Sequence, residues 1–559
     1  MTTYRTIETG VLIVGGGGAG CRAAIEAHDQ GADVLMIVKG TLGQSGCTLN
    51  VGISSAVGPW GDPADSHESS MQDLLSYGGF LGNQELAKVL VEESPDRVVE
   101  MDEWGIGFRR TDDGQMLVEQ DPEHSHGRSF YFEPSFKSQH DYGSNPGIAM
   151  MDILMREMQK RNVQVQNDVM LVDLLTNKGR VVGALALDCA KNELVVIKAR
   201  SVVLATGSYS QIFDPTTVSE QETGDGHAAA YRAGAELIDM ECIQFVATDF
   251  GYESQSLFLN GNHEEFLPTY GIMNPRDATK EVLCYAVWSE VREGRGNEND
   301  KIFINVKGDF RTSPATATLE ESGPRSHTAI GGIRINERCE TTIPGLYAAG
   351  AIGAGIYGHA RPQGYTSMIT LVFGRLAGLY ATQSARESAD TAIDEDQVQS
   401  LARLATDLVE KAGGIEPVET KSQIRAITRK QAWVIRDEDG LNEGLAQIKD
   451  ITEVMRVRAE QSTLKAIPRD GFEWAEYLEV PNMLACTELM LVGSLERQES
   501  RGAFVRADHP NTDNGNWLKN ITYKQVGGKL VLDSVPVELK YCQPESTTTR
   551  TPYLAALRS

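Results

Sequence analysis

Three glycines with a fixed spacing follow an apolar run near the N-terminus. The run covers residues 10–14, and the residues after the glycines, 21–27, have helical character. In a strand–turn–helix the first glycine permits a tight turn, the second lets a pyrophosphate approach the backbone, and the third lets helix and strand pack closely. The helix N-terminus then offers free N–H groups to the anion. The turn therefore predicts a dinucleotide site, with contacts from Gly15, Gly17, Gly18, Ala19 and Gly20.

The next apolar run, Ala32–Val38, completes a strand–helix–strand unit but lacks one common feature of such units. An acidic residue that binds a ribose hydroxyl usually stands at the end of this second strand. Here the strand ends in Val38 and Lys39. Two later segments, Ala205-Thr206-Gly207 and Thr223-Gly224-Asp225-Gly226, have the pattern of turns at strand ends.

The stretch from Pro275 to Val282, running on to Glu290–Gly296, carries the most specific information about chemistry. It resembles the Gly-Arg-Asp-Val-Val … Glu-Ile-Arg-Glu-Gly-Arg-Gly segment of the flavoprotein subunits of succinate dehydrogenase and fumarate reductase. In that family the first arginine donates a proton during alkene reduction, which implies this role for Arg276. Read without the resemblance, Arg276 caps a helix running from Asp277 to about Arg292, or pairs with a surface carboxylate.

Two further segments resemble the parts of that family that bind the substrate carboxylate. Ser326-His327-Thr328-Ala329-Ile330-Gly331-Gly332 is similar to its His-Tyr-x-x-Gly-Gly, and Gly358-His359-Ala360-Arg361-Pro362-Gln363-Gly364 is similar to its Gly-Ala-Asn-Arg-Leu-Gly-Gly. The resemblance implies that His327 and Arg361 bind the carboxylate. Arginine suits that role because its planar fork can hold a carboxylate through two parallel hydrogen bonds.

The resemblance also makes FAD the expected cofactor, since the family tends to have a non-acidic pair where Val38 and Lys39 stand. Members bound to membranes carry Ser-His-Thr with the histidine bonded to the flavin, whereas this chain has Ser45-Gly46-Cys47-Thr48. The missing histidine implies non-covalent FAD, and a cysteinyl linkage through Cys47 is the alternative. The remaining cofactor contacts implied are Lys39, Ser45, Cys47, Thr48, Ala205, Thr206, Gly207, Asp225, Gly350 and Ser367.

The far end of the expected substrate pocket departs from the family. Where the family has Gln-Phe-His-Pro-Thr, with the histidine on a second carboxylate, this chain has Gln244-Phe245-Val246-Ala247-Thr248. The family's Thr-Glu-x-x-Arg segment, a second carboxylate ligand and proton relay, has no clear counterpart. His263 or Glu264 could take over the relay. A four-carbon dicarboxylate and an enoate with a different far end both remain open as substrates.

The elements that position these residues predict an α/β fold. Strand patterns recur at Ser201–Gly207 and Ile343–Gly350, which indicates a Rossmann-like FAD-binding domain interrupted by a capping domain. Helical patterns fill 395–465 and indicate a helical domain. Apolar and polar residues alternate over 529–533 and indicate a small C-terminal β element. The expected boundaries are 1–235 and 331–394 for the FAD-binding domain, 236–330 for the cap, 395–515 for the helical domain and 516–559 for the C-terminal region. Asn482-Met483-Leu484, Glu499–Phe504 and Asn516-Trp517-Leu518 also resemble the family, so the resemblance covers nearly the whole chain.

Composition limits the classes of partner. The 559 residues carry a formal net charge of −26, which argues against nucleic acid and anionic membrane surfaces. Eight scattered cysteines without a Cys-x-x-Cys pair indicate neither a disulfide framework nor a zinc or iron–sulfur site. With no leader pattern and no apolar run of about 20 residues, we expect a cytoplasmic protein without a membrane span, whose membrane contact, if it has one, is made through another subunit.

The expected activity is the interconversion of a carbon–carbon single and double bond next to a carboxylate, by hydride transfer at flavin N5. Because the chain shows no haem or iron–sulfur ligands, a separate iron–sulfur or other electron-transfer subunit is expected. Three different functions compete with this reading: an L-aspartate oxidase, an adenylylsulfate-reductase-like enzyme, and an FAD electron-transfer or assembly subunit without its own substrate.

Overall fold

A central sheet with a parallel core organises the molecule. The computed structural model describes residues 4–133, 146–248, 256–307, 311, 313, 317–388, 392–411, 416–461, 468–545 and 548–550. In the sheet, β1 pairs in parallel with β2 and β9, and the order is β6-β2-β1-β9-β8-β7, with β17 also paired to β9. Its strands are β1 (Tyr4–Val14), β2 (Val34–Ile37), β6 (Gln164–Gln166), β7 (Val169–Asn177), β8 (Arg180–Asp188), β9 (Glu193–Leu204) and β17 (Leu346–Ala348).

Burial on both faces explains the continuous apolar runs of the parallel strands. Val11, Leu12 and Ile13 of β1 have no exposed surface, as expected for a parallel strand covered by helices. One covering helix is α1 (Gly18–Asp29), and α7 (Tyr365–Glu387) packs against it. The approach is close because a Cβ at Gly378 would lie 2.3 Å from the backbone oxygen of Ala23.

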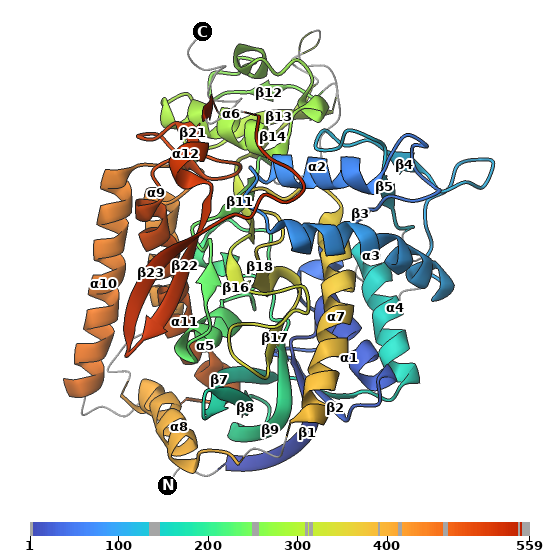
Figure 1. The fold of residues 1–559 in the computed structure, drawn as a ribbon. Helices are drawn as coiled ribbons and strands as arrows, with labels where there is room; N and C mark the ends of the chain where they lie inside the picture. The colour runs from blue at the N-terminus through green and yellow to red at the C-terminus, as the bar shows by residue number, and fades with distance from the viewer. Residues whose placement is uncertain are drawn as a thin grey trace.

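Helices far from the turn motif form one side of the molecule (Figure 1). α11 runs for 26 residues and packs against α5, α9 and α10. On β7 and β8, apolar residues such as Met170 and Leu185 join Val398 and Ala402 of α8 in a second hydrophobic cluster. The helices are α5 (Asp225–Arg232), α8 (Glu395–Glu410), α9 (Pro417–Gln431), α10 (Glu438–Gln461) and α11 (Gly471–Glu496).

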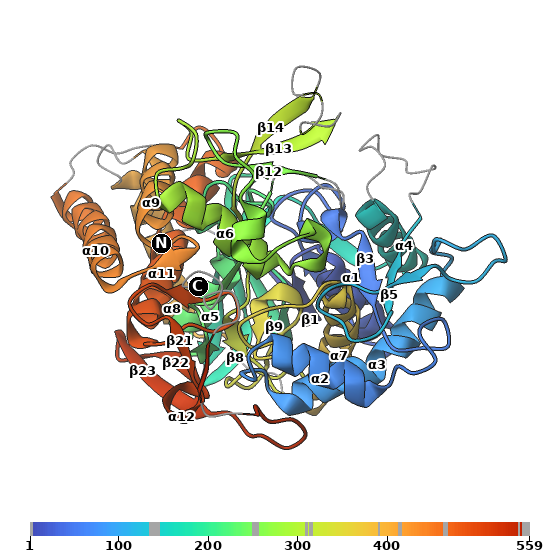
Figure 2. The same cartoon turned by 90° about the horizontal axis from the view of Figure 1, so that it is seen from above.

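The segment between β9 and β17 leaves the central sheet and forms a cap. Near its base β11 pairs antiparallel with β15, and beyond them lie α6 and a sheet of three strands. Figure 2 shows α6 across the middle of the molecule when seen from above. The elements are β11 (Ile243–Val246), β12 (Phe258–Leu259), α6 (Lys280–Arg292), β13 (Ile302–Lys307), β14 (Thr318–Ser322) and β15 (Arg325–Ala329).

The C-terminal strands return to the start of the cap. A hairpin of β22 and β23 pairs through β22 with β10, in a sheet of order β18-β16-β10-β22-β23. Residues 551–559 of the expected C-terminal region lie outside the described residues. The strands are β10 (Leu237–Ile238), β16 (Gly332–Arg334), β18 (Gly353–Ala354), β19 (Ile435–Arg436), β20 (Val505–Arg506), β21 (Asn511–Asp513), β22 (Lys519–Val526), β23 (Lys529–Pro536) and β24 (Thr548–Arg550).

The region between β2 and β6 adds a small sheet, β3-β5-β4, and three helices on the other side of the molecule (Figure 2). Their bounds, with the short C-terminal α12, are β3 (Ile53–Ser55), α2 (His67–Tyr77), α3 (Gln84–Glu103), β4 (Val118–Glu119), β5 (Ser129–Tyr131), α4 (Pro146–Lys160) and α12 (Asn514–Trp517). Among the helices that the structure describes, none combines the length and the apolar character needed to cross a membrane.

Candidate active site

The largest concentration of predicted contacts lies around a cavity at the carboxyl ends of β1, β2 and β9. The space between its walls, including the open mouth, is about 1320 Å³. The predicted contacts on its wall are Gly15, Gly17, Gly18, Ala19, Lys39, Ser45, Cys47, Thr48, Ala205, Thr206, Gly207, Asp225 and Gly350. Gly20 and Ser367 are not part of the wall.

Each of the three spaced glycines has the geometry that its expected role requires. Gly15 has φ +112°, and a Cβ there would lie 2.3 Å from the backbone oxygen of Ala205. A Cβ at Gly20 would lie 2.0 Å from the oxygen of Gly15, which explains why this residue stands behind the wall. At Gly17 the nearest atom would be Oγ1 of Thr48, at 3.7 Å. The Gly18 N–H at the start of α1 donates to Thr48 Oγ1 at 3.0 Å. The open space at Gly17 and the N-terminus of α1 together form a cradle that fits a pyrophosphate.

Lys39 joins the end of β2 to the start of α5. Its ammonium donates to Asp225 Oδ2 at 2.6 Å and to Thr223 Oγ1 at 2.7 Å, and it lies 2.7 Å from Glu479 Oε1. Burial by itself would lower the pKa of Lys39, but the carboxylates of Asp225 and Glu479 outweigh it and raise that pKa. The basic residue at the usual position of the acidic ribose ligand therefore serves to hold Asp225 at the cavity wall.

Cys47 faces a buried carboxyl group. Its Sγ donates to Glu222 Oε1 at 2.9 Å, while the Ser208 N–H donates to Glu222 Oε2 at 2.7 Å. Burial raises the pKa of the Cys47 thiol well above its usual value, and the charge of Glu222 raises it further. Cys47 is therefore held as a neutral thiol, the less nucleophilic form.

The two remaining side chains near the mouth hold the loops that carry the wall. Ser45 Oγ donates to Gln221 Oε1 at 2.6 Å. Ser367, which is fully buried in the first turn of α7, lies 2.6 Å from Ser54 Oγ and donates to the Gly364 carbonyl at 2.8 Å. Ser367 thus contacts the loop that carries Arg361.

Of the two residues expected to bind a carboxylate, Arg361 is part of the cavity wall and His327 is not. Arg361 is part of the wall and is 7% exposed, and its Nε donates to Gln244 Oε1 at 3.2 Å. His327 is half-buried on β15, with Nδ1 2.8 Å from Thr217 Oγ1. Burial, together with the positive charges of Arg361 and Lys280, lowers the pKa of His327 to about 3. His327 is therefore neutral near pH 7.

Arg276 lies outside the cavity wall. It is exposed, in a 3-10 helix over Pro275–Asp277. The helix that follows begins at Lys280, and its N-cap residue is Thr279. Arg276 is therefore not the cap of this helix.

The substitutes suggested for the missing relay also lie away from these residues. His263 and Glu264 are exposed. The ring of His263 packs against Phe303 of β13 with centroids 4.9 Å apart, and Glu264 Oε2 accepts a hydrogen bond from Asn260 at 3.1 Å. Neither side chain is part of the cavity wall.

Sequence reasoning did not select a group of polar residues behind Arg361. Gln244 donates to Glu281 Oε1 at 2.6 Å, and Lys280 donates to Glu123 Oε1 at 2.7 Å. Lys280 stands shortly after Arg276 in the same motif, which is a local signal that could have been used. The contact with Glu123 spans 157 residues of chain, and no local pattern announces it.

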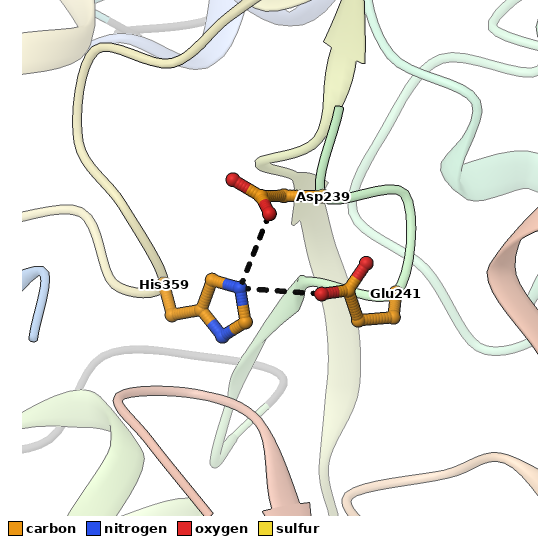
Figure 3. Close-up of side chains that lie close together, drawn as sticks. All are labelled: Asp239, Glu241 and His359. Atoms are coloured by element: carbon orange, nitrogen blue, oxygen red, sulfur yellow. Dashed lines mark ion pairs between the residues drawn. The ribbon is translucent and has the colours of Figure 1, made fainter. Parts of the chain in front are cut away.

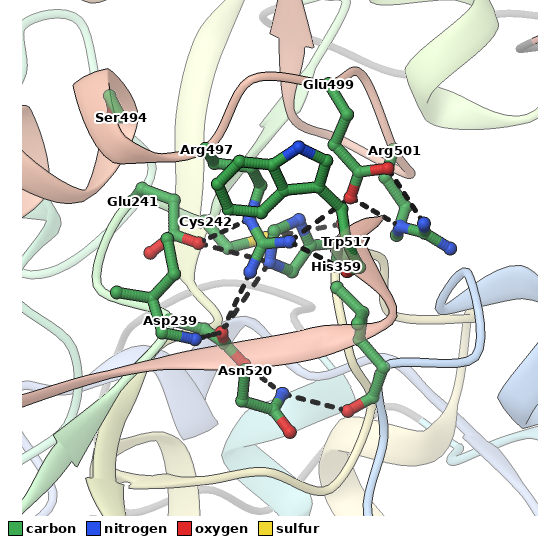
Figure 4. A network of polar contacts seen from close by, with 12 residues as sticks. Asp239, Glu241, Cys242, His359, Ser494, Arg497, Glu499, Arg501, Trp517 and Asn520 are labelled. Carbon is green, nitrogen blue, oxygen red and sulfur yellow. Dashed lines mark hydrogen bonds and ion pairs between the residues drawn. The ribbon is translucent and has the colours of Figure 1, made fainter. Parts of the chain in front are cut away.

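A buried ionic network supports the loop that carries Arg361. His359 Nε2 lies 3.5 Å from Glu241 Oε1 and 3.9 Å from Asp239 Oδ1 (Figure 3). These three side chains form the only group among the described residues whose ligand atoms are placed to hold a metal ion. The Arg497 guanidinium already bridges both carboxylates, at 2.8 Å to Glu241 and 3.4 Å to Asp239 (Figure 4). Both carboxylates are therefore already paired with an arginine, and the network has a structural role.

The same network contains the C-terminal motif. Glu499 accepts from Arg501 Nε at 2.7 Å and from Arg497 at 3.2 Å, and all three residues are at most 2% exposed. Arg501 also donates to the Gly79 carbonyl at 2.7 Å. The Glu499–Phe504 motif therefore ties the end of α11 to the cap entry and to the residues after α2.

Comparisons with known proteins agree with this geometry. The family model "FAD binding domain" matches residues 10–256 and 290–367, and "Fumarate reductase flavoprotein C-term" matches 421–549. One chain of the fumarate reductase (CoM/CoB) of Methanothermobacter marburgensis is 31% identical over 92% of this chain and 96% of its own length. The chain belongs to the flavoprotein family of fumarate reductase and succinate dehydrogenase.

Further relatives place the whole chain in this family. The succinate dehydrogenase flavoprotein subunit of Rickettsia bellii is 26% identical over 95% of both chains. The solved structure of Mycobacterium smegmatis Sdh1 in complex with UQ1 superposes with a TM-score of 0.84, at 26% identity over 97% of this chain and 96% of that one. As a member of the family, the chain is an FAD-dependent oxidoreductase that acts on CH–CH groups, and the glycine cradle fits the pyrophosphate of FAD.

Proposed function

We propose that this protein reduces an alkene next to a carboxylate, or oxidises the corresponding saturated acid, with fumarate and succinate as the leading pair. The observation that carries the proposal is the position of Arg361 in the wall of the cofactor cavity, with His327 next in sequence to the wall residue Thr328. A guanidinium and a neutral imidazole beside a flavin site suit a substrate carboxylate. FAD, when bound, supplies the hydride acceptor and donor.

Arg361 holds the carboxylate in this proposal, and its orientation is set by its neighbours. The Gln244 side chain accepts from Arg361 Nε and donates to the backbone carbonyl of Arg361 at 3.1 Å. Thr366 accepts from the other side of the guanidinium. With these contacts satisfied, the remaining N–H groups of the fork are available to an anion. His327, fixed through Nδ1 by Thr217, offers Nε2 to the same group.

Arg276 supplies the proton in this proposal. Guanidinium groups are very weak acids in water, so the exposed Arg276 must come to lie over the substrate before the proton is transferred. The supporting observation is its position directly before α6, whose first turn carries Lys280 and Glu281 of the polar group behind Arg361.

The cofactor and the partner follow from the same reasoning. We propose that FAD is held without a covalent bond, because Cys47 is a neutral thiol where the family's attached histidine stands. We also propose a separate electron-transfer subunit, with iron–sulfur centres as the leading type, and a cytoplasmic location with membrane contact only through another subunit.

Anaerobic oxidation of reduced viologen by the purified holoprotein tests the function. We expect oxidation that depends on fumarate and falls by at least about 100-fold in Arg276→Ala. Arg110→Ala, which removes another exposed arginine 3.7 Å from Asp102, is the matched control and should keep the activity. Loss in both variants, or in neither, would contradict the role of Arg276.

A second candidate is supported by Val246, which is half-buried at the position of the family's second-carboxylate histidine. A chain without its own substrate would hold FAD that reduced viologen can reduce, and no enoate would reoxidise it. L-Aspartate offered as electron donor to the oxidised holoprotein tests for an aspartate oxidase, and sulfite with AMP tests for an adenylylsulfate-reductase-like enzyme. Reoxidation by fumarate that Arg361→Lys weakens would exclude the chain without a substrate.

A further inference from the structure

A continuous line of hydrogen bonds runs from the cofactor cavity into the cap. Arg361 donates to Gln244, and Gln244 donates to Glu281 Oε1 at 2.6 Å. The Tyr77 hydroxyl stands between Glu281 Oε2 and Glu123 Oε1, the latter at 3.5 Å. Lys280 completes the line by donating to Glu123 Oε1 at 2.7 Å. The two ends of the line are cations, and the two carboxylates lie between them.

Burial makes this line rigid and strengthens the interactions between its charges. Arg361, Gln244, Glu281 and Glu123 are each at most 8% exposed. Burial alone would raise the pKa of Glu123, but the Lys280 ammonium outweighs it and lowers that pKa, so Glu123 is ionised at neutral pH. Charges at such sites interact far more strongly than charges in water.

Lys280 has hydrogen-bonding capacity left. An ammonium group carries three donors, and Glu123 is its only hydrogen-bond partner among the residues that the structure describes. The Lys280 side chain is 16% exposed, against 3% for Glu123. Its positive charge, like that of Arg361, also reaches His327. Lys280 is thus a partly open cation at the end of the hydrogen-bonded line that begins at Arg361.

At the position where the family has a histidine on the second carboxylate, this chain has the apolar Val246. We propose that Lys280, held in place by Glu123, binds the second carboxylate of the substrate and so makes the enzyme selective for dicarboxylates. This inference rests on the proposed function, since it assumes that Arg361 and His327 bind the first carboxylate. Glu123 acts as a positioning residue.

A purely structural role for Lys280 predicts different behaviour. If Lys280 only neutralises Glu123, removing both charges together should restore the stability and the succinate affinity that the single variant loses, because no unpaired buried charge remains. If Lys280 binds substrate, the double variant should recover stability and still bind dicarboxylates poorly. The comparison of single and double variants separates the two roles.

The experiment uses the holoprotein with FAD bound and four variants. Lys280→Met removes the charge at similar length, Lys280→Arg keeps it, and Lys280→Met with Glu123→Gln removes the pair. Lys88→Met is the matched control, because Lys88 forms an exposed pair with Glu92 on α3. Binding of succinate and of butyrate is measured from the change in flavin absorbance, and KM and kcat are measured with fumarate and with crotonate.

We expect Lys280→Met to raise the Kd for succinate and the KM for fumarate about 10- to 100-fold, the range for a charge-assisted hydrogen bond. Butyrate and crotonate should change less than about twofold, since they lack the second carboxylate. Lys280→Arg should recover most of the affinity, and Lys88→Met should match the wild type. The double variant should regain the wild-type melting temperature without regaining succinate affinity.

Three outcomes would overturn the inference. Equal losses for substrates with one and with two carboxylates would show that Lys280 acts through structure alone, as would restored succinate affinity in the double variant. Unchanged succinate binding in Lys280→Met, in an enzyme whose fumarate reduction depends on Arg276, would refute the inference and leave the proposed function intact. A wild type that holds FAD but neither binds nor reduces any enoate would refute both.

Discussion

Single residues decide whether the cofactor site forms. Gly17 and Gly20 lie three residues apart, yet an added Cβ would meet very different surroundings at the two positions. At Gly20 it would lie 2.0 Å from a backbone oxygen, whereas at Gly17 the nearest atom would be 3.7 Å away. One glycine therefore serves the packing of α1 on β1, and the other serves the ligand.

This difference leads to a prediction for two alanine variants. Gly17→Ala should fold with a melting temperature close to that of the wild-type apoprotein but should bind FAD at least about 10-fold more weakly, because the methyl group occupies the space of the pyrophosphate. Gly20→Ala should destabilise the apoprotein itself, because the backbone must move. Thermal unfolding without FAD and titration with FAD measure the two effects. Similar behaviour of the two variants would contradict this assignment.

Cys47 supports a second prediction at this scale. Its thiol remains protonated beside Glu222, so it should not attack the flavin. Acid precipitation should release all of the FAD into the supernatant, and Cys47→Ser should still bind FAD. Yellow fluorescence that migrates with the denatured polypeptide on a gel would show a covalent linkage and refute the prediction.

At the scale of elements, buried ion pairs connect segments that are far apart in the sequence. Glu499 lies between Arg497 and Arg501, accepts the backbone N–H of Asp513 at 2.9 Å, and has no exposed surface. Breaking a buried pair is costly because it leaves an uncompensated charge in a medium of low polarity. The end of α11, the entry to the cap and the loop of Arg361 depend on this contact together.

Glu499→Gln should therefore lower the free energy of unfolding by about 3 kcal/mol or more. The control is Glu473→Gln, which breaks the pair with Arg469, a residue whose side chain is 85% exposed, and it should cost less than about 1 kcal/mol. Urea denaturation of both holoproteins gives the values. A loss of similar size in the two variants would mean that the network is not a principal source of stability.

How much could be predicted from the sequence differed from element to element. The glycine turn was predictable because strand, turn and helix are contiguous, and the FAD-binding fold was confirmed by the structure and the comparisons. Lys280 and Glu123 were missed because 157 residues separate them. The position of Arg276 depends on how the cap rests on the rest of the molecule, which is a matter of tertiary packing. The roles of the site residues and the domain boundaries remain predictions.

At the scale of the whole molecule, proton binding links stability to pH. His227 is fully buried, and neither ring nitrogen has a hydrogen-bond partner among the described residues. Burial lowers its pKa to about 3, whereas an imidazole in the unfolded chain has a pKa of about 6.5. Between these two pKa values the imidazole is protonated in the unfolded chain but not in the folded protein. The free energy of unfolding therefore decreases as the pH falls from about 6.5 towards 3, and this group has no effect above about pH 6.5.

His227→Phe should remove this contribution. In the wild type, each such group makes the free energy of unfolding fall by up to about 1.4 kcal/mol per pH unit below pH 6.5. The variant lacks one such group, so its free energy of unfolding should fall less steeply. The control is His67→Ala, which changes an exposed histidine and should leave the slope as it is. Urea midpoints between pH 4.5 and 8 give the comparison, and equal slopes in wild type and His227→Phe would refute it.

The wall of the cofactor cavity has a consequence for how the protein is made. Its residues run from Val14 to Thr370, and β17, one neighbour of the central strand β9, begins only at Leu346. A chain still attached to the ribosome cannot complete the wall until about two thirds of it has been synthesised and has left the exit tunnel. The N-terminal glycine turn is synthesised early, but it can bind FAD only after the later wall residues have been added. FAD therefore binds a nearly complete chain, and chains truncated before these residues should remain without FAD.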